Sequence, residues 1–157
     1  GTSEAAACVP HVLRQILDPS YDRVFATMDT HDKEYLSTLE GKKLPVPHCI
    51  KGTIGWQLNP DVQKALQKRN AVILEKPGFG SMDLMKDIQK ETPDSIVICG
   101  LCTDICVMCN AMLLRAALPG TPIAVDADAC AAVTPAKQKE ALSILTSCQI
   151  DIIQEDL

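Results

Sequence analysis

A cysteine that follows a glycine turn is the residue of this chain best suited to nucleophilic chemistry. Cys106 lies in the segment Gly-Leu-Cys-Thr-Asp-Ile-Cys-Val (100–107), directly after the apolar run 95–99. This order predicts a strand, a tight turn and then a thiol in the first turn of a helix. At that position the helix dipole and the unpaired backbone N–H groups favour the thiolate over the thiol. We therefore expect Cys106 to act as a nucleophile.

A lysine ends a second apolar run. Lys76 follows residues 71–75 and precedes Pro-Gly-Phe-Gly-Ser. If both runs are parallel strands, their carboxyl ends meet at the same edge of the sheet, so the ammonium group lies near Cys106. A lysine beside a cysteine lowers the pKa of the thiol and can orient an attacked carbonyl. Taken alone, a lysine at a strand end is more often a solvated surface charge.

Three further side chains have the chemistry of a metal site. Asp29 and His31 form a D-x-H pair at the end of the run 23–28, and His48 follows 17 residues later. In an extended segment both members of such a pair point the same way, and a mixed oxygen and nitrogen set suits zinc, iron or manganese. The alternative is that Asp29 caps a turn, His31 is exposed and His48 packs under two prolines.

The elements that must position these residues alternate along the chain. This alternation predicts an α/β fold with three layers, in which helices cover both faces of a parallel, doubly wound sheet. The expected strands are 23–28, 71–75, 95–99, 122–126 and 149–153, and the expected helices are 3–17, 60–69, 82–89, 104–118 and 135–147. Thr134 and Pro135 mark the start of the last helix, and Asp104 is expected to cap the helix of Cys106. The long irregular stretch 29–59 is expected to be functional.

Composition restricts the class of protein. Residues 1–157 are expected to form one domain, and the net charge of -5 argues against a nucleic-acid partner. The 46% apolar content can build a core without disulfides, so the eight cysteines indicate reduced thiols in the cytoplasm. No apolar run approaches the roughly 18 residues of a membrane span, and we expect a protein without a leader segment. A small molecule is the expected partner.

Four motifs in this order resemble those of the isochorismatase-like cysteine hydrolases, and within them the nicotinamidase-related amidases. The motifs are D-x-H, H-C-x-x-G-T-x-G, a strand-end lysine before F-G-S, and G-x-x-T-D-x-C-V. The resemblance implies that Cys106 is the nucleophile, that Lys76 belongs to its triad, and that a divalent metal binds Asp29, His31 and His48. Zinc is the first choice for this metal, and iron or manganese is the alternative.

The resemblance also implies the geometry of the site. A cis peptide is expected at Leu101–Cys102, and the backbone N–H groups of Cys102 and Cys106 would form an oxyanion hole. Leu101, Phe79 and Tyr35 are the expected walls of the substrate pocket. Cys102 could also be a second thiol in this pocket, open to a disulfide with Cys106.

The implied reaction converts a small carboxamide, first of all nicotinamide, to the carboxylic acid and ammonia through a thioester. A role in pyridine nucleotide salvage and assembly as a homo-oligomer would go with it. The alternatives are hydrolysis of another carboxamide or of an N-carbamoyl compound, a metal-free vinyl-ether hydrolase, and a non-catalytic metal-binding homologue.

One family feature has no counterpart in the sequence. The family's triad aspartate ends a first, central strand, and no such motif precedes Gly1. Without that strand, the runs 23–28 and 95–99 have no shared neighbour, and backbone groups on both are unpaired. We therefore expect that roughly 20 residues, which carry this strand and the aspartate, belong to the native protein.

Overall fold

Parallel strands pair in two separate sets in the computed structural model, which describes residues 2–155. Strand β1 (Phe25–Asp29) pairs with β2 (Val72–Lys76). A second sheet has the order β3-β4-β5, with bounds Ile96–Leu101, Ile123–Ala131 and Asp151–Ile153. Within the described residues β1 and β3 are not paired, as the sequence predicts.

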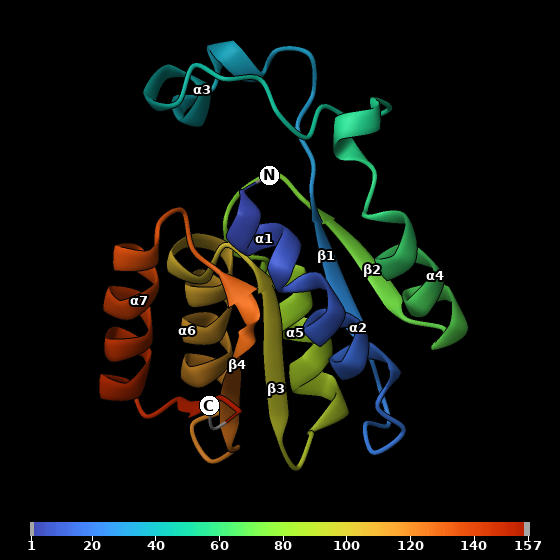
Figure 1. The fold of residues 1–157 in the computed structure, drawn as a ribbon, viewed down its shortest axis with the longest axis vertical. Helices are drawn as coiled ribbons and strands as arrows, with labels where there is room; N and C mark the ends of the chain where they lie inside the picture. Colours follow the sequence, from blue (N-terminus) through green and yellow to red (C-terminus); the bar gives the residue numbers. More distant parts are fainter. Residues whose placement is uncertain (1, 156–157) are drawn as a thin grey trace.

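Helices cover both faces of these strands, which confirms the predicted α/β architecture. Figure 1 shows α1 and α2 in front of the strands and α5 behind them. The helices are α1 (Ser3–Ala7), α2 (Val9–Leu17), α3 (Leu39–Lys43), α4 (Pro60–Lys68), α5 (Met82–Glu91), α6 (Met108–Ala117) and α7 (Pro135–Ser147). None of the helices in this described part is long and apolar enough to cross a bilayer.

Each face has its own apolar core. One core joins α5, α6 and α7 to β4 through Leu84, Leu114, Val125 and Leu145, among others. The other, smaller core joins α2 to α4 through Ile16 and Leu66. Burial of these side chains contributes the main favourable free energy of the fold, about 1.5–3 kcal/mol for each large aliphatic group. The strand ends that carry the candidate site are therefore anchored from both faces.

The first predicted helix is interrupted. The sequence predicts one helix over 3–17, whereas the structure ends α1 at Ala7 and begins α2 at Val9. Pro10 lies in the first turn of α2, where its missing N–H has no helical partner to lose. The start of α7 is as predicted, because the Thr134 side chain accepts a hydrogen bond from the Lys137 N–H and Pro135 opens the helix.

Strand β4 runs past its predicted end at Asp126. The pairing of β3 with β4 shifts register between Ile98 and Gly100, which frees backbone groups on β4. The Asp126 carboxylate, 2% exposed, accepts the N–H groups of Asp128 and Ala129 at 3.0 and 3.1 Å. A buried side chain thus replaces the strand pairing that the register shift removes, and β4 continues to Ala131.

Candidate active site

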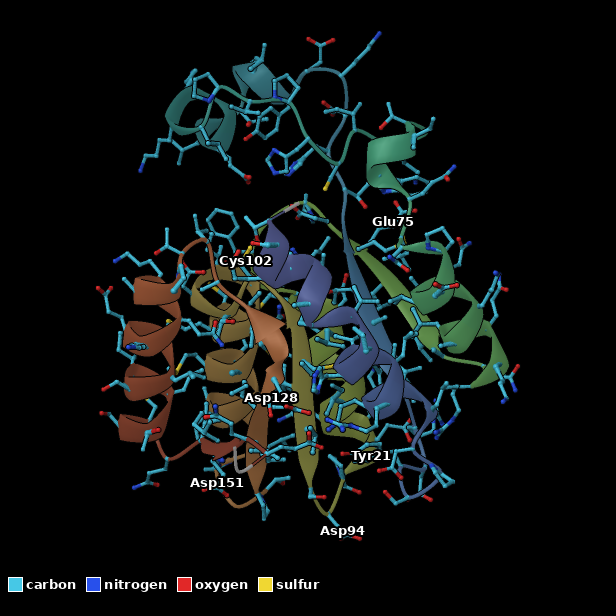
Figure 2. The ribbon with its side chains drawn as sticks, in the orientation of Figure 1. Tyr21, Glu75, Asp94, Cys102, Asp128 and Asp151 are labelled. Carbon is cyan, nitrogen blue, oxygen red and sulfur yellow. The ribbon has the colours of Figure 1, made fainter. Side chains whose placement is uncertain are left out.

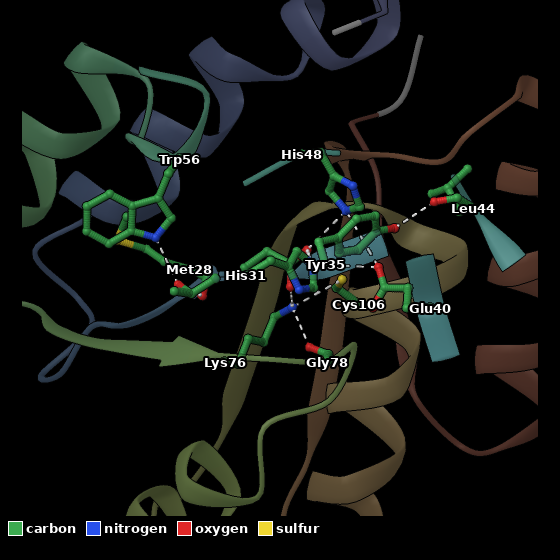
Figure 3. Close-up of polar contacts among 12 residues, drawn as sticks. Met28, His31, Tyr35, Glu40, Leu44, His48, Trp56, Lys76, Gly78 and Cys106 are labelled. Carbon is green, nitrogen blue, oxygen red and sulfur yellow. Dashed lines mark hydrogen bonds and ion pairs between the residues drawn. The ribbon is translucent and has the colours of Figure 1, made fainter. Parts of the chain in front are cut away.

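The candidate residues gather at the edge of the sheet where the strands end. In Figure 2, Cys102 lies at this edge, while Asp94, which precedes β3, lies at the opposite end of the molecule. Figure 3 shows Lys76 and Cys106 in contact, with His31 and His48 beside them. The side chains that the sequence predicts to carry chemistry are thus brought together, although they come from distant segments.

The Lys76 ammonium group is the centre of this arrangement. The side chain is 3% exposed, and its Nζ donates to Asp29 Oδ1 at 2.9 Å, to the Gly78 carbonyl at 2.8 Å and to Cys106 Sγ at 3.4 Å. An ammonium group has three protons to donate, and each has an acceptor here. The alternative of a solvated surface lysine is therefore wrong.

The charges of Lys76 and Cys106 depend on each other. Burial alone lowers the pKa of Lys76, but its hydrogen bond to Asp29 and the nearby charges outweigh that effect and raise the pKa. Burial raises the pKa of the Cys106 thiol, and the Lys76 ammonium opposes this rise without cancelling it. The direction of this pKa shift runs against the predicted preference of Cys106 for the thiolate, because burial opposes the ionised sulfur that the ammonium group favours.

Four side chains form a group that could hold a metal ion. They are Asp29, His31, Glu40 and His48, and their ligand atoms all lie within 4.8 Å of one another. Each histidine Nε2 faces Asp29 Oδ2, at 3.4 Å from His31 and 3.7 Å from His48, and each lies 3.6 Å from Glu40 Oε1. Two imidazole nitrogens and two carboxylate oxygens suit zinc, iron or manganese.

The orientation of the histidines supports this interpretation. Nδ1 of His48 lies 2.9 Å from the Val46 carbonyl, so the ring donates there and directs the lone pair of Nε2 toward the group. Nε2 of His31 is buried and has no hydrogen-bond partner among the described residues. A buried nitrogen without a partner costs free energy, and a cation would satisfy it. The residues therefore fit a divalent metal.

Glu40 is the member of this group that the sequence does not predict. It lies on α3, a five-residue helix inside the stretch expected to be irregular. The Thr38 side chain caps α3 by accepting from the Gly41 N–H. A Cβ at Gly41 would lie 2.0 Å from the Tyr35 carbonyl oxygen, so only glycine allows the helix to pack this closely. The signals in the sequence are the capping threonine and this glycine.

A short bridge closes the base of the segment that carries the histidines. His31 and Ile50 pair in parallel, with the His31 N–H donating to the Cys49 carbonyl at 2.9 Å and the Lys51 N–H donating to the His31 carbonyl at 2.8 Å. This bridge brings His31 next to His48, although 16 residues separate them in the chain. The segment projects from the body of the molecule in Figure 1 and ends in α3.

The three residues predicted to line a pocket differ in exposure. Phe79 and Leu101 are exposed, at 44% and 47%. Leu101 precedes Cys106 in the same turn, and the Phe79 carbonyl accepts from Asn110 Nδ2, which also donates to the Cys106 carbonyl. Tyr35 is 1% exposed, its ring centroid lies 4.8 Å from that of His31 and 5.0 Å from that of His48, and its hydroxyl donates to the Leu44 carbonyl. Tyr35 therefore supports the histidines, and no open wall is formed by its ring.

The turn that carries the thiol has an unusual backbone. The Leu101–Cys102 peptide is cis, as the resemblance implies, and it follows Gly100, whose positive φ of 120° suits glycine. A π-helical turn, Thr103–Val107, then leads into α6, where a regular helix is predicted. A backbone hydrogen bond from Cys102 acts on the Cys106 thiol. The two residues of the predicted oxyanion hole are thus adjacent in space.

Asn110 is a second residue that the sequence does not single out. It lies one helical turn after Cys106, and its Nδ2 donates to the carbonyls of Cys106 and Phe79 at 2.8 and 3.2 Å. Its Oδ1 accepts the Ser81 N–H at 2.9 Å. Asn110 therefore ties the loop after β2, which receives a Lys76 hydrogen bond, to the turn of the thiol.

No carboxylate in residues 2–155 is hydrogen-bonded to the Cys106 thiol. Asp29 contacts it only through Lys76. Asp104 does not cap its helix as predicted; its Oδ1 accepts the Val133 N–H at 3.2 Å, because the loop after β4 lies against this turn. All eight cysteines are free in the described part of the chain.

Comparison with known proteins gives one family. The family model described as Isochorismatase domain matches residues 1–156. An uncharacterized isochorismatase family protein, PncA, of Bacillus subtilis (strain 168) is 33% identical over an alignment of 98 residues, and the match covers 58% of this chain and 53% of that protein. The chain therefore matches about half the length of this curated relative.

Two solved structures show the same fold. Pyrazinamidase/nicotinamidase from Streptococcus mutans UA159 has a TM-score of 0.83 and 27% identity, with 96% of this chain and 87% of that chain covered. Nicotinamidase PncA from Bacillus subtilis has a TM-score of 0.75 and 25% identity, with 95% and 83% covered.

Proposed function

Because the chain belongs to the isochorismatase family, we propose that it is a cysteine amidohydrolase that cleaves a small carboxamide. The observation that carries this proposal is the buried Lys76 ammonium group, which is bonded at once to the Cys106 thiol and to Asp29. Such a cation has a clear task beside a sulfur that must become negative in order to attack a carbonyl.

The proposed roles follow from these contacts. Cys106 attacks the amide carbonyl, the C–N bond breaks, and the nitrogen leaves as ammonia with the proton lost by the thiol, which leaves a thioester. Water then cleaves the thioester, which releases the carboxylic acid and restores the Cys106 thiol. Lys76 stabilises negative charge on the sulfur, while the N–H groups of Cys102 and Cys106 receive the oxyanion. In comparable sites the loss of one such donor costs about 2.7–4 kcal/mol of transition-state stabilisation. Proton transfer needs a base, and the raised pKa of the Cys106 thiol makes this requirement stronger.

A divalent metal, with zinc as the first choice and iron or manganese as alternatives, would be held by Asp29, His31, Glu40 and His48. When bound, it would act as a Lewis acid that orients the substrate. The chain's own contribution is the fixed position of the ligands. Asp29 joins the two halves of the site, since Oδ1 accepts from Lys76 and Oδ2 faces both histidines.

Nicotinamide is the proposed substrate, and this choice rests on two observations. Two solved nicotinamidases share the fold at 25% identity or more. Phe79 and Leu101 are large, exposed apolar side chains near the thiol and could contact a flat ring. Another carboxamide or an N-carbamoyl compound is the alternative.

An assay of ammonia release tests the proposal. Purified protein, with its metal content measured by elemental analysis, is incubated with nicotinamide, a linear carboxamide and an N-carbamoyl amino acid. We expect ammonia from nicotinamide and no release by Cys106→Ala. Metal-loaded, folded protein that releases ammonia from none of the three compounds would instead favour a non-catalytic metal-binding homologue.

A further inference from the structure

The D-x-H pair of the metal group has a middle residue that faces the other way. Asp29 ends β1, and Thr30 and His31 continue its extended course toward the bridge with Ile50. Alternate side chains of an extended segment point to opposite faces. Asp29 and His31 direct their ligand atoms to the face where the group that could hold a metal lies. The Thr30 side chain therefore lies on the opposite face, behind the two ligands.

Trp56 occupies that opposite face and holds Thr30. Its indole Nε1 donates to Thr30 Oγ1 at 2.9 Å, and this hydroxyl donates in turn to the Met28 carbonyl at 3.1 Å. A hydroxyl has one proton, so the proton and a lone pair of Thr30 are both used here. Figure 3 shows the indole beside Met28 and apart from His48 and Cys106. Trp56 therefore lies outside the candidate site, and its link to that site is Thr30.

Two short turns bring Trp56 back to the end of β1. Trp56 is the last residue of the 3-10 helix Ile54–Trp56, which follows the bridge between His31 and Ile50. The Trp56 N–H donates to the Thr53 carbonyl at 3.2 Å, and the Thr53 N–H donates to the Ile50 carbonyl at 3.1 Å. These hydrogen bonds connect the indole to the bridge that positions the histidines.

A second contact anchors the indole ring. Lys51 Nζ lies 5.8 Å from the centroid of the Trp56 ring, within the distance of a cation–π contact, and donates to Glu75 Oε2 at 2.6 Å. Glu75 directly precedes Lys76 at the end of β2. The ring is therefore connected to β2 through Lys51 and to the end of β1 through Thr30. A tryptophan suits this place, because its apolar ring carries a polar N–H at one end.

We propose that Trp56 is a positioning residue, which holds Thr30 and thereby fixes the direction in which Asp29 and His31 present their ligand atoms to a divalent metal. Thr30 is β-branched and has few rotamers, so a hydrogen bond to its hydroxyl also constrains the backbone between the two ligands. Groups that lie behind metal ligands orient those ligands and thereby set the metal affinity. This inference rests on the metal site of the proposed function.

The zinc affinity of the full chain tests the proposal. Trp56→Phe keeps an aromatic ring and removes the N–H, while Thr30→Val keeps the shape of the side chain and removes the hydroxyl. We expect each change to lower the affinity for zinc by about tenfold, the lower end of the effect of groups behind metal ligands. Competition with a chromogenic chelator measures it. Thr30→Ser keeps the hydroxyl and should bind zinc nearly as wild type does.

Two further measurements separate positioning from a general loss of stability. Trp56→Phe and Thr30→Val remove the same hydrogen bond, so the double variant should lose no more affinity than either single variant. The visible absorption of bound cobalt(II) depends on ligand geometry and should change in both. Tyr21→Phe is the control, because it removes a hydroxyl that donates to Gln15 at the opposite end of the molecule (Figure 2). It should alter neither the zinc affinity nor the cobalt spectrum.

Wild-type protein provides a test that needs no variant. Coupling between two sites is reciprocal, so a hydrogen bond that favours metal binding is itself strengthened when the metal binds. Trp56 is the only tryptophan of the chain, so its indole N–H gives a single side-chain signal in NMR spectra. Saturation with zinc should slow hydrogen exchange of this N–H by the same factor of about ten.

Three outcomes would overturn the proposal. They are equal zinc affinity in wild type and both single variants, additive losses in the double variant, and an indole N–H whose exchange zinc does not slow. The ammonia assay fails independently of these tests. Ammonia release by wild type, with zinc affinity unchanged in the variants, would remove the role of Trp56 and keep the proposed function. Weaker zinc binding by the variants of a chain that releases no ammonia would do the reverse.

Discussion

At the scale of single residues, the site depends on charges that are buried and paired. Lys76, Asp29 and Cys106 form one hydrogen-bonded series, and Asp29 also faces both histidines. Asp29 therefore links the pair of Lys76 and Cys106 directly to the residues that could hold a metal. The sequence predicts each of these residues from its type and its place at a strand end.

Glu40→Gln tests the fourth ligand of the metal group. The change removes a negative charge that lies 3.6 Å from both imidazole nitrogens and keeps the side-chain size. We expect the affinity for zinc to fall by at least about tenfold, the scale that loss of an outer partner of a ligand already reaches. Competition with a chromogenic chelator measures it. Glu34→Gln, an exposed neighbour in the same segment, is the control, and equal affinities in both variants would exclude Glu40.

Cys99 gives a prediction about pH. Burial raises the pKa of this thiol from 9.0 to about 12, so the unfolded chain ionises at a lower pH than the folded one. The stabilisation is present below pH 9 and is lost as the pH rises toward 12. Urea unfolding between pH 8 and 11 should therefore show a steeper loss of stability in wild type than in Cys99→Ala. Parallel curves would contradict a Cys99 thiol that folding keeps neutral.

At the scale of elements, short segments with little pattern of their own hold the site. Helix α3 has five residues, and the turn of Cys106 is π-helical instead of α-helical. The sequence shows a strand, a glycine and a thiol in order, but hydrophobic periodicity needs longer runs to reveal a helix of this length. Tertiary packing, here Gly41 against the Tyr35 carbonyl, decides such elements.

Gly41→Ala tests that contact. A methyl group 2.0 Å from the Tyr35 carbonyl oxygen forces α3 away, and Glu40 moves with it. We expect weaker zinc binding and a loss of about 1–3 kcal/mol in the free energy of unfolding, the usual cost of overpacking. Calorimetric titration with zinc measures the first. Gly55→Ala, where the nearest atom lies 3.9 Å from the added methyl, should retain wild-type affinity, and an equal loss in both would refute the packing argument.

Asp126→Ala tests the register shift of β4. The change leaves the N–H groups of Asp128 and Ala129 without their acceptor, so we expect a loss of about 1–3 kcal/mol in the free energy of unfolding. Asp126→Asn keeps a carbonyl oxygen and should lose less. Urea unfolding measures both, with the exposed Asp151→Ala as control. A loss no larger than that of the control would mean that the carboxylate does not hold the strand.

At the scale of the whole molecule, the sequence predicts the layers and the division of the sheet correctly. Apolar runs and helical periods place the five strands of residues 2–155, and within these residues no strand lies between β1 and β3, as predicted. The ionisation state of Cys106 could not be predicted, because local sequence reveals a nearby cation but not the depth of burial. Glu40 and Asn110 were missed for a related reason, since only folding brings them to the site. A homo-oligomer stays a prediction.

The most direct measurement of the central claim is mass spectrometry of protein quenched with acid during incubation with nicotinamide. We expect a nicotinoyl group on the peptide that contains Cys106, with ammonia released in solution and no adduct in Cys106→Ala. Cys109→Ala removes the thiol three residues after Cys106. This variant should still form the adduct, because Lys76 donates to the sulfur of Cys106. Ammonia release that persists in Cys106→Ala, or an acyl group found on another residue, would contradict the account.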